Sequence, residues 1–162
     1  MKSLAFRHKI KLDPMAGELE FRVATPKEQF FNRAFGFLVG LGLSPSYNYL
    51  LEVKGRKSGK IYSTPVNLHE VNGKQYLVAP RGRTQWVRNA EVAGEVTLKK
   101  IGRRRRYKLR ALADSEKPEI LKSYLMRYGS MVQRFFPMQP GAPLAAFAEI
   151  AMGYPAFELI PV

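Results

Sequence analysis

The segment that decides the fold is residues 61–79, which read IYSTPVNLHEVNGKQYLVA. Positions 61–68 and 75–79 are rich in β-branched and aromatic residues, which is typical of β-strands. Between them stand Asn72 and Gly73, and both central residues of a type I′ turn need the positive φ angles that this pair adopts easily. The segment therefore predicts a hairpin of two antiparallel strands.

Further strands are predicted on both sides of this hairpin. They are expected over residues 49–53, 95–100, 104–113 and 156–160. A run of strands interrupted by one short helix does not suit a parallel sheet with crossover helices, and it favours an antiparallel sheet or barrel with helices packed outside. The predicted fold class is therefore α+β.

Helices are predicted where apolar residues recur at helical spacing. Near the N-terminus, Thr25, Pro26 and Glu28 are typical of a helix start, and an apolar face follows as far as Gly42. We treat residues 1–24 as an N-terminal arm, because their mixed charges show little periodicity.

Three more helices are expected further along the chain. Thr84 is predicted to cap a short helix over residues 85–93. A longer helix is predicted over 115–128, ending at Gly129, and a last one over 144–152. With the strands, these helices indicate a single domain over residues 25–162.

The composition narrows the classes of partner. The 162 residues carry a net charge of +14, which would attract nucleic acid, anionic lipid or a polyanionic small molecule. The chain has no cysteine, and its two histidines, His8 and His69, are too few and too far apart to suggest a metal site. No metal is therefore expected.

The apolar segments suggest a cytoplasmic protein. Residues 1–13 lack the apolar run and the cleavage site of a secretory signal, and the apolar stretch 30–51 is broken too often to cross a bilayer. The predicted helix over residues 30–43, with surface lysines, leaves contact with a membrane surface open as an alternative.

Two polar segments could bind an anion. Residues 54–60, KGRKSGK, combine two glycines with side chains that donate hydrogen bonds to phosphate, although a solvated basic loop is the simpler interpretation. Residues 78–89, VAPRGRTQWVRN, place a helix start beside arginines and the only tryptophan. Trp86 could flank a planar ring, or it could be a core residue at a junction of helix and sheet.

In combination, these residues resemble the deazaflavin-dependent nitroreductase family. The matching pieces are residues 52–59, 63–65, 76–79 and 86–89, and the likeness runs from about residue 50 to residue 113. The resemblance implies a split β-barrel of the FMN-binding type, often a homodimer. It also implies the anionic coenzyme F-420, a deazaflavin with a phosphate and an oligoglutamate tail, with FMN as the alternative.

The resemblance also assigns residues to that coenzyme. Arg56, Lys57, Ser58 and Gly59 would hold the phosphate, with Lys54 or Lys60 near the tail. Thr64, Pro65, Val78, Ala79 and Pro80 would line the ring, and Trp86, Arg88 and Asn89 would complete the wall and the phosphate end.

The implied reaction is hydride transfer from the reduced coenzyme to a small electron-poor acceptor: a quinone, a nitro compound or an enone. Tyr124 and Tyr128, one helical turn apart, are candidate proton donors, and a stripe of core residues is the alternative for them. The short segment 81–85 before the tryptophan departs from many relatives, so nitroreductase activity itself is not implied.

Two other functions remain open from the sequence. One is a split barrel without catalysis that binds a lipid or another anionic ligand. The second is a nucleic-acid-binding module, which would rest on the net charge and on the run from Arg103 to Arg106. That run lacks the interleaved aromatic residues on which bases stack, so nucleic acid is not the favoured partner.

Overall fold

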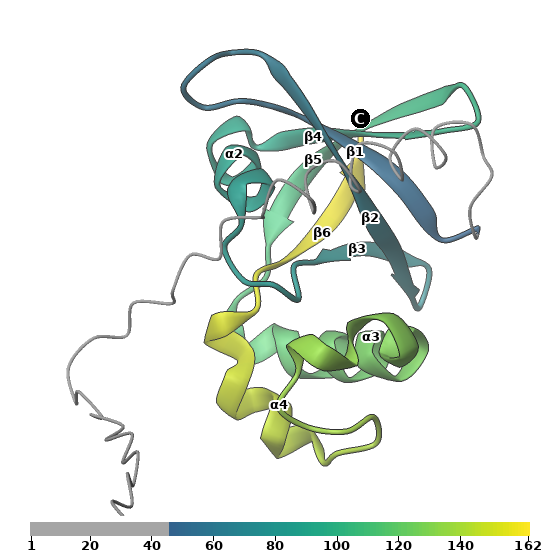
Figure 1. The fold of residues 1–162 in the computed structure, drawn as a ribbon, viewed down its shortest axis with the longest axis vertical. Helices are drawn as coiled ribbons and strands as arrows, with labels where there is room; N and C mark the ends of the chain where they lie inside the picture. The colour runs from purple at the N-terminus through teal and green to yellow at the C-terminus, as the bar shows by residue number, and fades with distance from the viewer. Residues whose placement is uncertain (1–45) are drawn as a thin grey trace, which may run out of the picture.

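The computed structural model describes residues 46–162, and these form a closed antiparallel barrel of six strands with flanking helices (Figure 1). The strands are β1 (Asn48–Lys54), β2 (Ile61–Val71), β3 (Lys74–Val78), β4 (Glu95–Lys100), β5 (Arg103–Ala111) and β6 (Ala156–Pro161). Around the barrel their order is β1-β2-β3-β6-β5-β4. The predicted α+β class and antiparallel barrel are confirmed, whereas the predicted arm 1–24 and the helix starting at Thr25 lie outside the described residues.

The hairpin that opens the sequence argument is present as predicted. Asn72 and Gly73 have φ angles of 51° and 75°, and the pairing of Leu68 with Leu77 continues the ladder from this turn. The barrel closes where β4 pairs with β1, at Leu51 opposite Leu98. Closure leaves no free sheet edge in the barrel, as the antiparallel prediction allows.

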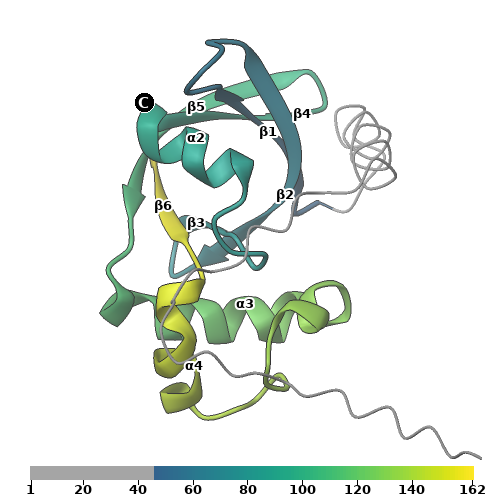
Figure 2. The same ribbon diagram turned by 60° about the vertical axis from the view of Figure 1, so that its left-hand side comes forward.

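Three helices flank the barrel in the described part of the chain: α2 (Gln85–Ala93), α3 (Lys117–Val132) and α4 (Leu144–Ile150). Figures 1 and 2 show α3 and α4 stacked below the barrel, while α2 lies beside the strands near the β1–β2 loop. None of the helices between residues 46 and 162 is long and apolar enough to cross a membrane.

Four local predictions need correction. Thr84 occupies the N-cap position of α2, but its hydroxyl makes no capping hydrogen bond. The helix predicted to end at Gly129 continues to Val132, since Gly129 serves close packing: an added Cβ would lie 3.1 Å from Pro140 Cγ. The last predicted helix ends at Ile150 and gives way to a 3₁₀ turn. The strand predicted to reach residue 113 ends at Ala111.

The core has two main parts. One fills the barrel, with buried members such as Leu51, Leu77 and Leu98. The second lies between the barrel and the helices α3 and α4, where Leu121 and Phe147 are among its buried members. The lower end of the barrel is therefore covered by helices, and the β1–β2 loop lies away from this cover (Figure 1).

Candidate functional site

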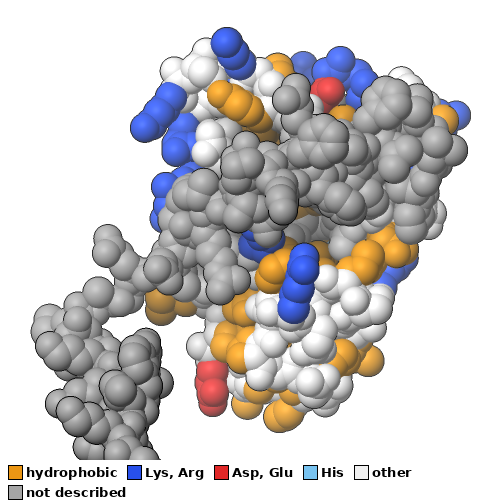
Figure 3. Space-filling view, viewed as in Figure 1, with side chains coloured by type: hydrophobic (Ala, Val, Ile, Leu, Met, Phe, Trp, Pro, Cys, Tyr) orange, Lys and Arg blue, Asp and Glu red, His pale blue; other side chains and the backbone are white. Residues whose placement is uncertain are grey.

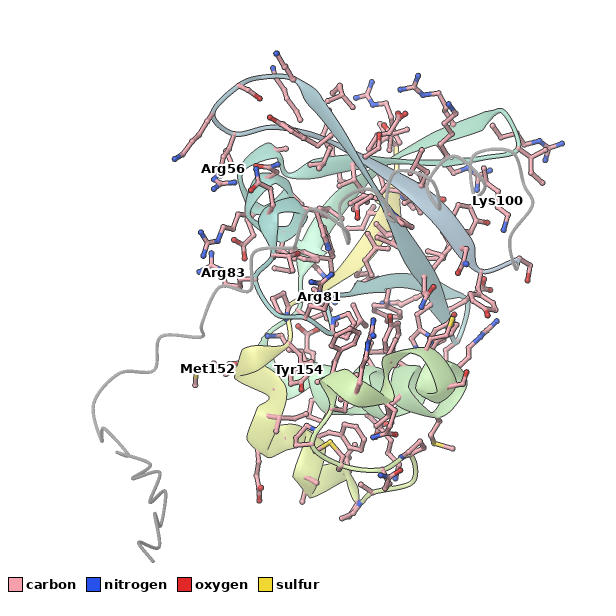
Figure 4. All side chains as sticks on the ribbon, viewed as in Figure 1. Arg56, Arg81, Arg83, Lys100, Met152 and Tyr154 are labelled. Atoms are coloured by element: carbon pink, nitrogen blue, oxygen red, sulfur yellow. The ribbon has the colours of Figure 1, made fainter. Side chains whose placement is uncertain are left out.

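The β1–β2 loop and helix α2, which carry the two predicted anion-binding segments, lie side by side. The backbone N–H of Arg56 donates a hydrogen bond to Asn89 Oδ1 at 3.2 Å, and Arg56 Nη1 donates to the same oxygen at 2.8 Å. Figure 4 shows Arg56 beside α2. One amide side chain of the helix thus fixes both the backbone and the guanidinium of the loop.

The loop makes a tight turn, and glycine is required at positions 55 and 59 for different reasons. The N–H of Gly55 donates to the carbonyl of Lys60 at 2.8 Å, and the N–H of Gly59 donates to the carbonyl of Gly55 at 2.9 Å. A Cβ on Gly55 would lie 2.5 Å from Tyr62 Cε2, whereas Gly59 has a φ of 70°. Gly55 is needed for space and Gly59 for its backbone conformation.

The outer part of the loop presents hydrogen-bond donors to solvent. Lys57, Ser58, Gly59 and Lys60 are all exposed. Ser58 Oγ lies 3.1 Å from Tyr62 Oη and accepts a 3.3 Å hydrogen bond from the backbone of Lys60, which fixes its position in the turn. Two cations and a hydroxyl in one turn are groups that bind phosphate, whereas the N–H of Gly59 already donates to the carbonyl of Gly55.

Helix α2 and its N-cap residue carry two buried donors without partners among the described residues. Asn89 is only 1% exposed, and among the described residues its Nδ2 has no hydrogen-bond partner. The hydroxyl of Thr84, at the start of the same helix, is buried and equally unpartnered within the described chain. A buried donor left unsatisfied is costly. With the guanidinium of Arg56, these donors are of the kind that an anionic ligand would accept from.

Trp86 packs largely against the core. It lies half-buried against residues of the barrel interior, and its ring centroid is 6.0 Å from that of Phe157. This arrangement matches the alternative of a core tryptophan at a junction of helix and sheet. Only the exposed part of the indole could contact a ligand.

The predicted ring wall is brought together only in part. Thr64 and Pro65 are half-buried on β2, while Val78 packs against the α3 cluster and Ala79 is buried with Val87. The side chains of Val78 and Ala79 therefore serve packing. Pro80 is half-buried just after β3, and Arg88 is half-buried on α2 beside Asn89.

Two arginines near the site were not among the predicted ligands. Arg83 forms an ion pair with Glu91, and the Arg81 guanidinium lies 5.9 Å from the centre of the Phe135 ring. Both residues immediately precede α2, and Figure 4 shows Arg83 on the same side of the molecule as Arg56. The signal in the sequence was their position at a helix start, where the helix dipole favours anions.

A cleft of about 520 Å³ adjoins the loop. Its lining includes Lys54, Gly55 and Arg56, together with Glu52 and Glu95 from β1 and β4. Glu52 is paired with Arg104 and Glu95 with Arg106, so the charges of the cleft are mixed. The lining of the cleft is therefore not uniformly cationic.

The candidate proton donors Tyr124 and Tyr128 lie elsewhere, buried between α3 and β2. Tyr128 Oη donates to the carbonyl of Leu68 at 2.8 Å, and Tyr124 Oη accepts a 3.4 Å hydrogen bond from Asn67. Burial raises the pKa of Tyr124 well above its usual value. These contacts favour the alternative of a packed core stripe.

His69 lies in the same interface and is 2% exposed. Its Nε2 is 2.8 Å from Ser123 Oγ, which itself donates to the carbonyl of Ile120 at 3.1 Å. Ser123 Oγ therefore accepts from a protonated Nε2, which leaves Nδ1 as an acceptor with no partner among the described residues. Burial first, and then the charge of Arg127, lower the pKa of His69 to about 4.

Comparison with known proteins points to one family. Residues 26–134 match the model of the family described as F420H(2)-dependent quinone reductase. No curated protein sequence matches the chain. The family match supports a deazaflavin coenzyme, and the alternative of FMN gains no support from it.

Solved structures share the fold at low identity. Protein Atu2129 of Agrobacterium tumefaciens, of unknown function, is 19% identical with a TM-score of 0.50; the match covers 78% of this chain and 53% of that protein, so this chain spans about half its length. A structure described as a domain-swapped dimer is 18% identical, with a TM-score of 0.50 and coverage of 82% and 92%. A structure described as an F420-H2 dependent reductase is 20% identical, with a TM-score of 0.47 and coverage of 70% and 94%.

The two structures with a TM-score of 0.50 share the fold of this chain, and the sequence match carries the family assignment. It spans more than half of the 162 residues, including the β1–β2 loop, α2 and all of α3. The chain therefore belongs to the F420H(2)-dependent quinone reductase family.

Proposed function

We propose that this protein transfers hydride from reduced coenzyme F-420 to a small electron-poor organic acceptor, such as a quinone, a nitro compound or an enone. The observation that carries the proposal is the junction at which Arg56 is held by Asn89 Oδ1 while Asn89 Nδ2 stays buried without a partner in the described chain. An anionic coenzyme would satisfy that donor, and the family match names such a coenzyme.

The residues that would hold the coenzyme follow from what each can donate. The side chains of Arg56, Lys57 and Ser58 would bind the phosphate, and Gly59 would shape the turn that presents them. The exposed Lys54 and Lys60 are available to the oligoglutamate tail. Arg88, Asn89 and the exposed part of Trp86 would complete the phosphate end and the wall. Thr64, Pro65 and Pro80 remain candidates for the ring, whereas the side chains of Val78 and Ala79 are packed in the core.

When bound, the reduced deazaflavin supplies the hydride, so the protein has to bind, orient and exclude water rather than form a covalent intermediate. A quinone that accepts a hydride and one proton becomes a hydroquinone. The proposal assigns no proton donor to Tyr124 or Tyr128, because both hydroxyls are engaged in the interface of α3 with β2.

The test is turnover of the reduced coenzyme. Purified full-length protein should oxidise it in the presence of a quinone, nitro compound or enone, followed by the return of the absorbance of the oxidised deazaflavin. A parallel titration with FMN serves as the comparison of ligands. If the protein binds F-420 tightly but no acceptor oxidises the bound reduced coenzyme, the protein is a coenzyme-binding protein, and the proposed enzymatic activity is contradicted.

We also propose a homodimer, since one structural relative is described as a domain-swapped dimer and the family resemblance points the same way. Light scattering on the purified chain should give twice the mass of 18.4 kDa. A monomer at micromolar concentration would contradict this part of the proposal.

A further inference from the structure

The turn between β4 and β5 presents an isoleucine to solvent. Ile101 and Gly102 form its two central residues, with φ angles of 50° and 70°, and Ile101 is 65% exposed. Lys100 pairs with Arg103 directly behind the turn. The tip of this hairpin is thus a large aliphatic side chain between cations.

The isoleucine is unfavourable for the turn itself. A β-branched residue with positive φ is strained, and the preferred residue at this position is asparagine. The same chain uses asparagine in the equivalent turn between β2 and β3, where Asn72 has a φ of 51°. Turn formation therefore does not explain why Ile101 stands at the tip, and a contact made by its exposed side chain would.

The cations around the tip fall into two groups. Arg104 and Arg106 are held by Glu52 and Glu95. Arg103 and Arg105 are exposed and form no ion pair with any residue between 46 and 162. Two free guanidinium groups on the strand that leaves the turn give the tip an unbalanced positive charge.

This surface is separate from the candidate coenzyme site. Leu50 pairs with Lys99, so the hairpin tip extends past the start of β1, whereas the loop with Arg56 follows the end of β1. The view in Figure 1 shows the tip and the β1–β2 loop at opposite sides of the barrel. In the space-filling view, Lys and Arg side chains gather on the barrel half of the molecule, away from α3 and α4 (Figure 3).

We propose that the β4–β5 hairpin docks this protein on an anionic lipid bilayer. Ile101 enters the headgroup region, and Arg103 and Arg105, with Lys99 beside them, contact the lipid phosphates. An exposed aliphatic side chain flanked by cations is the combination that binds anionic membrane surfaces. The proposal is independent of the coenzyme site, so each can fail alone.

Lipid is favoured over nucleic acid by what the tip presents. Base recognition by a basic surface uses aromatic rings for stacking, and here the nearest ring along the sheet, Tyr49, is covered by Lys100 Nζ at 5.1 Å from its centroid. An aliphatic side chain at the tip has no partner on a phosphate backbone. A bilayer accommodates both the aliphatic tip and the cations.

The experiment is flotation of the full-length protein with phosphatidylcholine vesicles that contain or lack phosphatidylglycerol. Wild-type protein should float with the anionic vesicles only. Because each cation near an anionic surface strengthens binding about fivefold, the double variant Arg103→Gln/Arg105→Gln should bind about 25-fold more weakly. The matched control Lys122→Gln, on α3, should bind as the wild type does.

A second variant separates insertion from charge alone. Ile101→Asn copies the favoured turn residue of Asn72, so its Tm should be equal to or above that of the wild type while its vesicle binding falls about tenfold. Loss of binding with no loss of stability is a result that a purely structural role of Ile101 would not give.

Three outcomes would overturn the proposal. The first is no flotation, or equal flotation with neutral vesicles. The second is flotation that neither hairpin variant changes, because another part of the chain would then bind the lipid. The third is that Ile101→Asn leaves vesicle binding unchanged while an added oligonucleotide displaces the protein from the vesicles. That result would assign the arginines to nucleic acid.

Discussion

Gly55 is the residue on which the shape of the candidate phosphate loop depends most directly. Its position leaves no room for a side chain, since a Cβ would contact Tyr62 Cε2 at 2.5 Å and Ser58 Oγ at 2.8 Å. The sequence predicted a glycine-dependent turn here, but not that a tyrosine seven residues later is what excludes the methyl group.

We predict that Gly55→Ala destabilises the protein by about 1–3 kcal/mol and weakens coenzyme binding, because the loop must move to admit the methyl group. Urea unfolding and a coenzyme titration measure the two effects. The double variant Gly55→Ala/Tyr62→Ala should recover part of the stability. If Gly55→Ala is as stable as the wild type, the claim that Tyr62 leaves no room for a side chain at position 55 is contradicted.

His69 predicts a pH dependence of stability. Its pKa is about 4 in the folded chain against 6.5 for an ordinary histidine, so between those values the unfolded chain binds a proton that the folded chain does not. The free energy of unfolding should therefore fall as the pH drops from 6.5 towards 4, by at most about 3 kcal/mol. Urea unfolding of wild type and His69→Gln at about pH 7 and about pH 5 checks this.

The carboxylates Glu116 and Glu158 do not account for a change in stability between pH 6.5 and about pH 5. Arginine and backbone hydrogen bonds lower their pKa values below 4.5, so their contribution is lost only at more acidic pH. His69→Gln should be nearly insensitive over the same range. An equal slope in both proteins would show that His69 is not the group that titrates.

The burial of His69 shows the limit of sequence at this scale. The sequence does not show whether His69 is buried or exposed, because its partner Ser123 comes from α3, 54 residues later. Only the packing of that helix on β2 decides between burial and exposure. By contrast, Asn72 and Gly73 could be predicted because their turn depends on local backbone preferences alone.

At the scale of elements, the site depends on how the β1–β2 loop is attached to α2. Asn89 makes the connection: its Oδ1 accepts from Arg56, while its Nδ2 has no partner among the described residues and is the donor that we propose for the coenzyme. A substitution that keeps the acceptor for Arg56 but replaces the donor Nδ2 by an acceptor can separate the effect on folding from the effect on coenzyme binding.

We predict that Asn89→Asp keeps the attachment of Arg56 but weakens coenzyme binding at least about tenfold, because a carboxylate would stand next to the phosphate. Asn89→Leu should also lose stability, by about 2 kcal/mol, since it leaves the donors of Arg56 without their acceptor. Chemical denaturation and a binding titration compare the variants. Undiminished binding by Asn89→Asp would exclude an anion at this amide.

The interface of α3 with β2 predicts that the two tyrosines act in packing. Tyr128→Phe removes the hydrogen bond to the carbonyl of Leu68 and should cost about 1 kcal/mol of stability. Tyr124→Phe and Tyr128→Phe should both retain kcat within about twofold. A loss of kcat of about a hundredfold in either variant, with the fold intact, would restore the role of proton donor.

Most elements could be predicted from local patterns, but the exact residues at which they end could be predicted only in some cases. α2 has the predicted bounds because Gly94, with a φ of 69°, terminates it locally. α3 passes its predicted end because Gly129 is held against Pro140, which comes from a different segment. Local signals thus set helix ends only where tertiary contacts do not override them.

For the whole molecule, the sequence predicted an antiparallel barrel but not the order of its strands. β6 inserts between β3 and β5 after the chain has built α3 and α4, so its neighbours are far away in sequence. The same long-range step buries Val78 and Ala79 between the barrel and other elements, which the predicted ring wall did not anticipate. The family resemblance, which assigns both segments to one coenzyme, correctly implied that the loop with Arg56 and the helix with Trp86 meet.

The most direct measurement of the central claim is a fluorescence titration of oxidised F-420 into wild type, Lys57→Gln and the matched control Lys122→Gln. If the β1–β2 loop and α2 form one anionic site, wild type and control should bind alike, and Lys57→Gln should bind about tenfold more weakly because it loses a charge-assisted hydrogen bond to phosphate. Equal affinities of all three proteins would contradict a phosphate site on this loop.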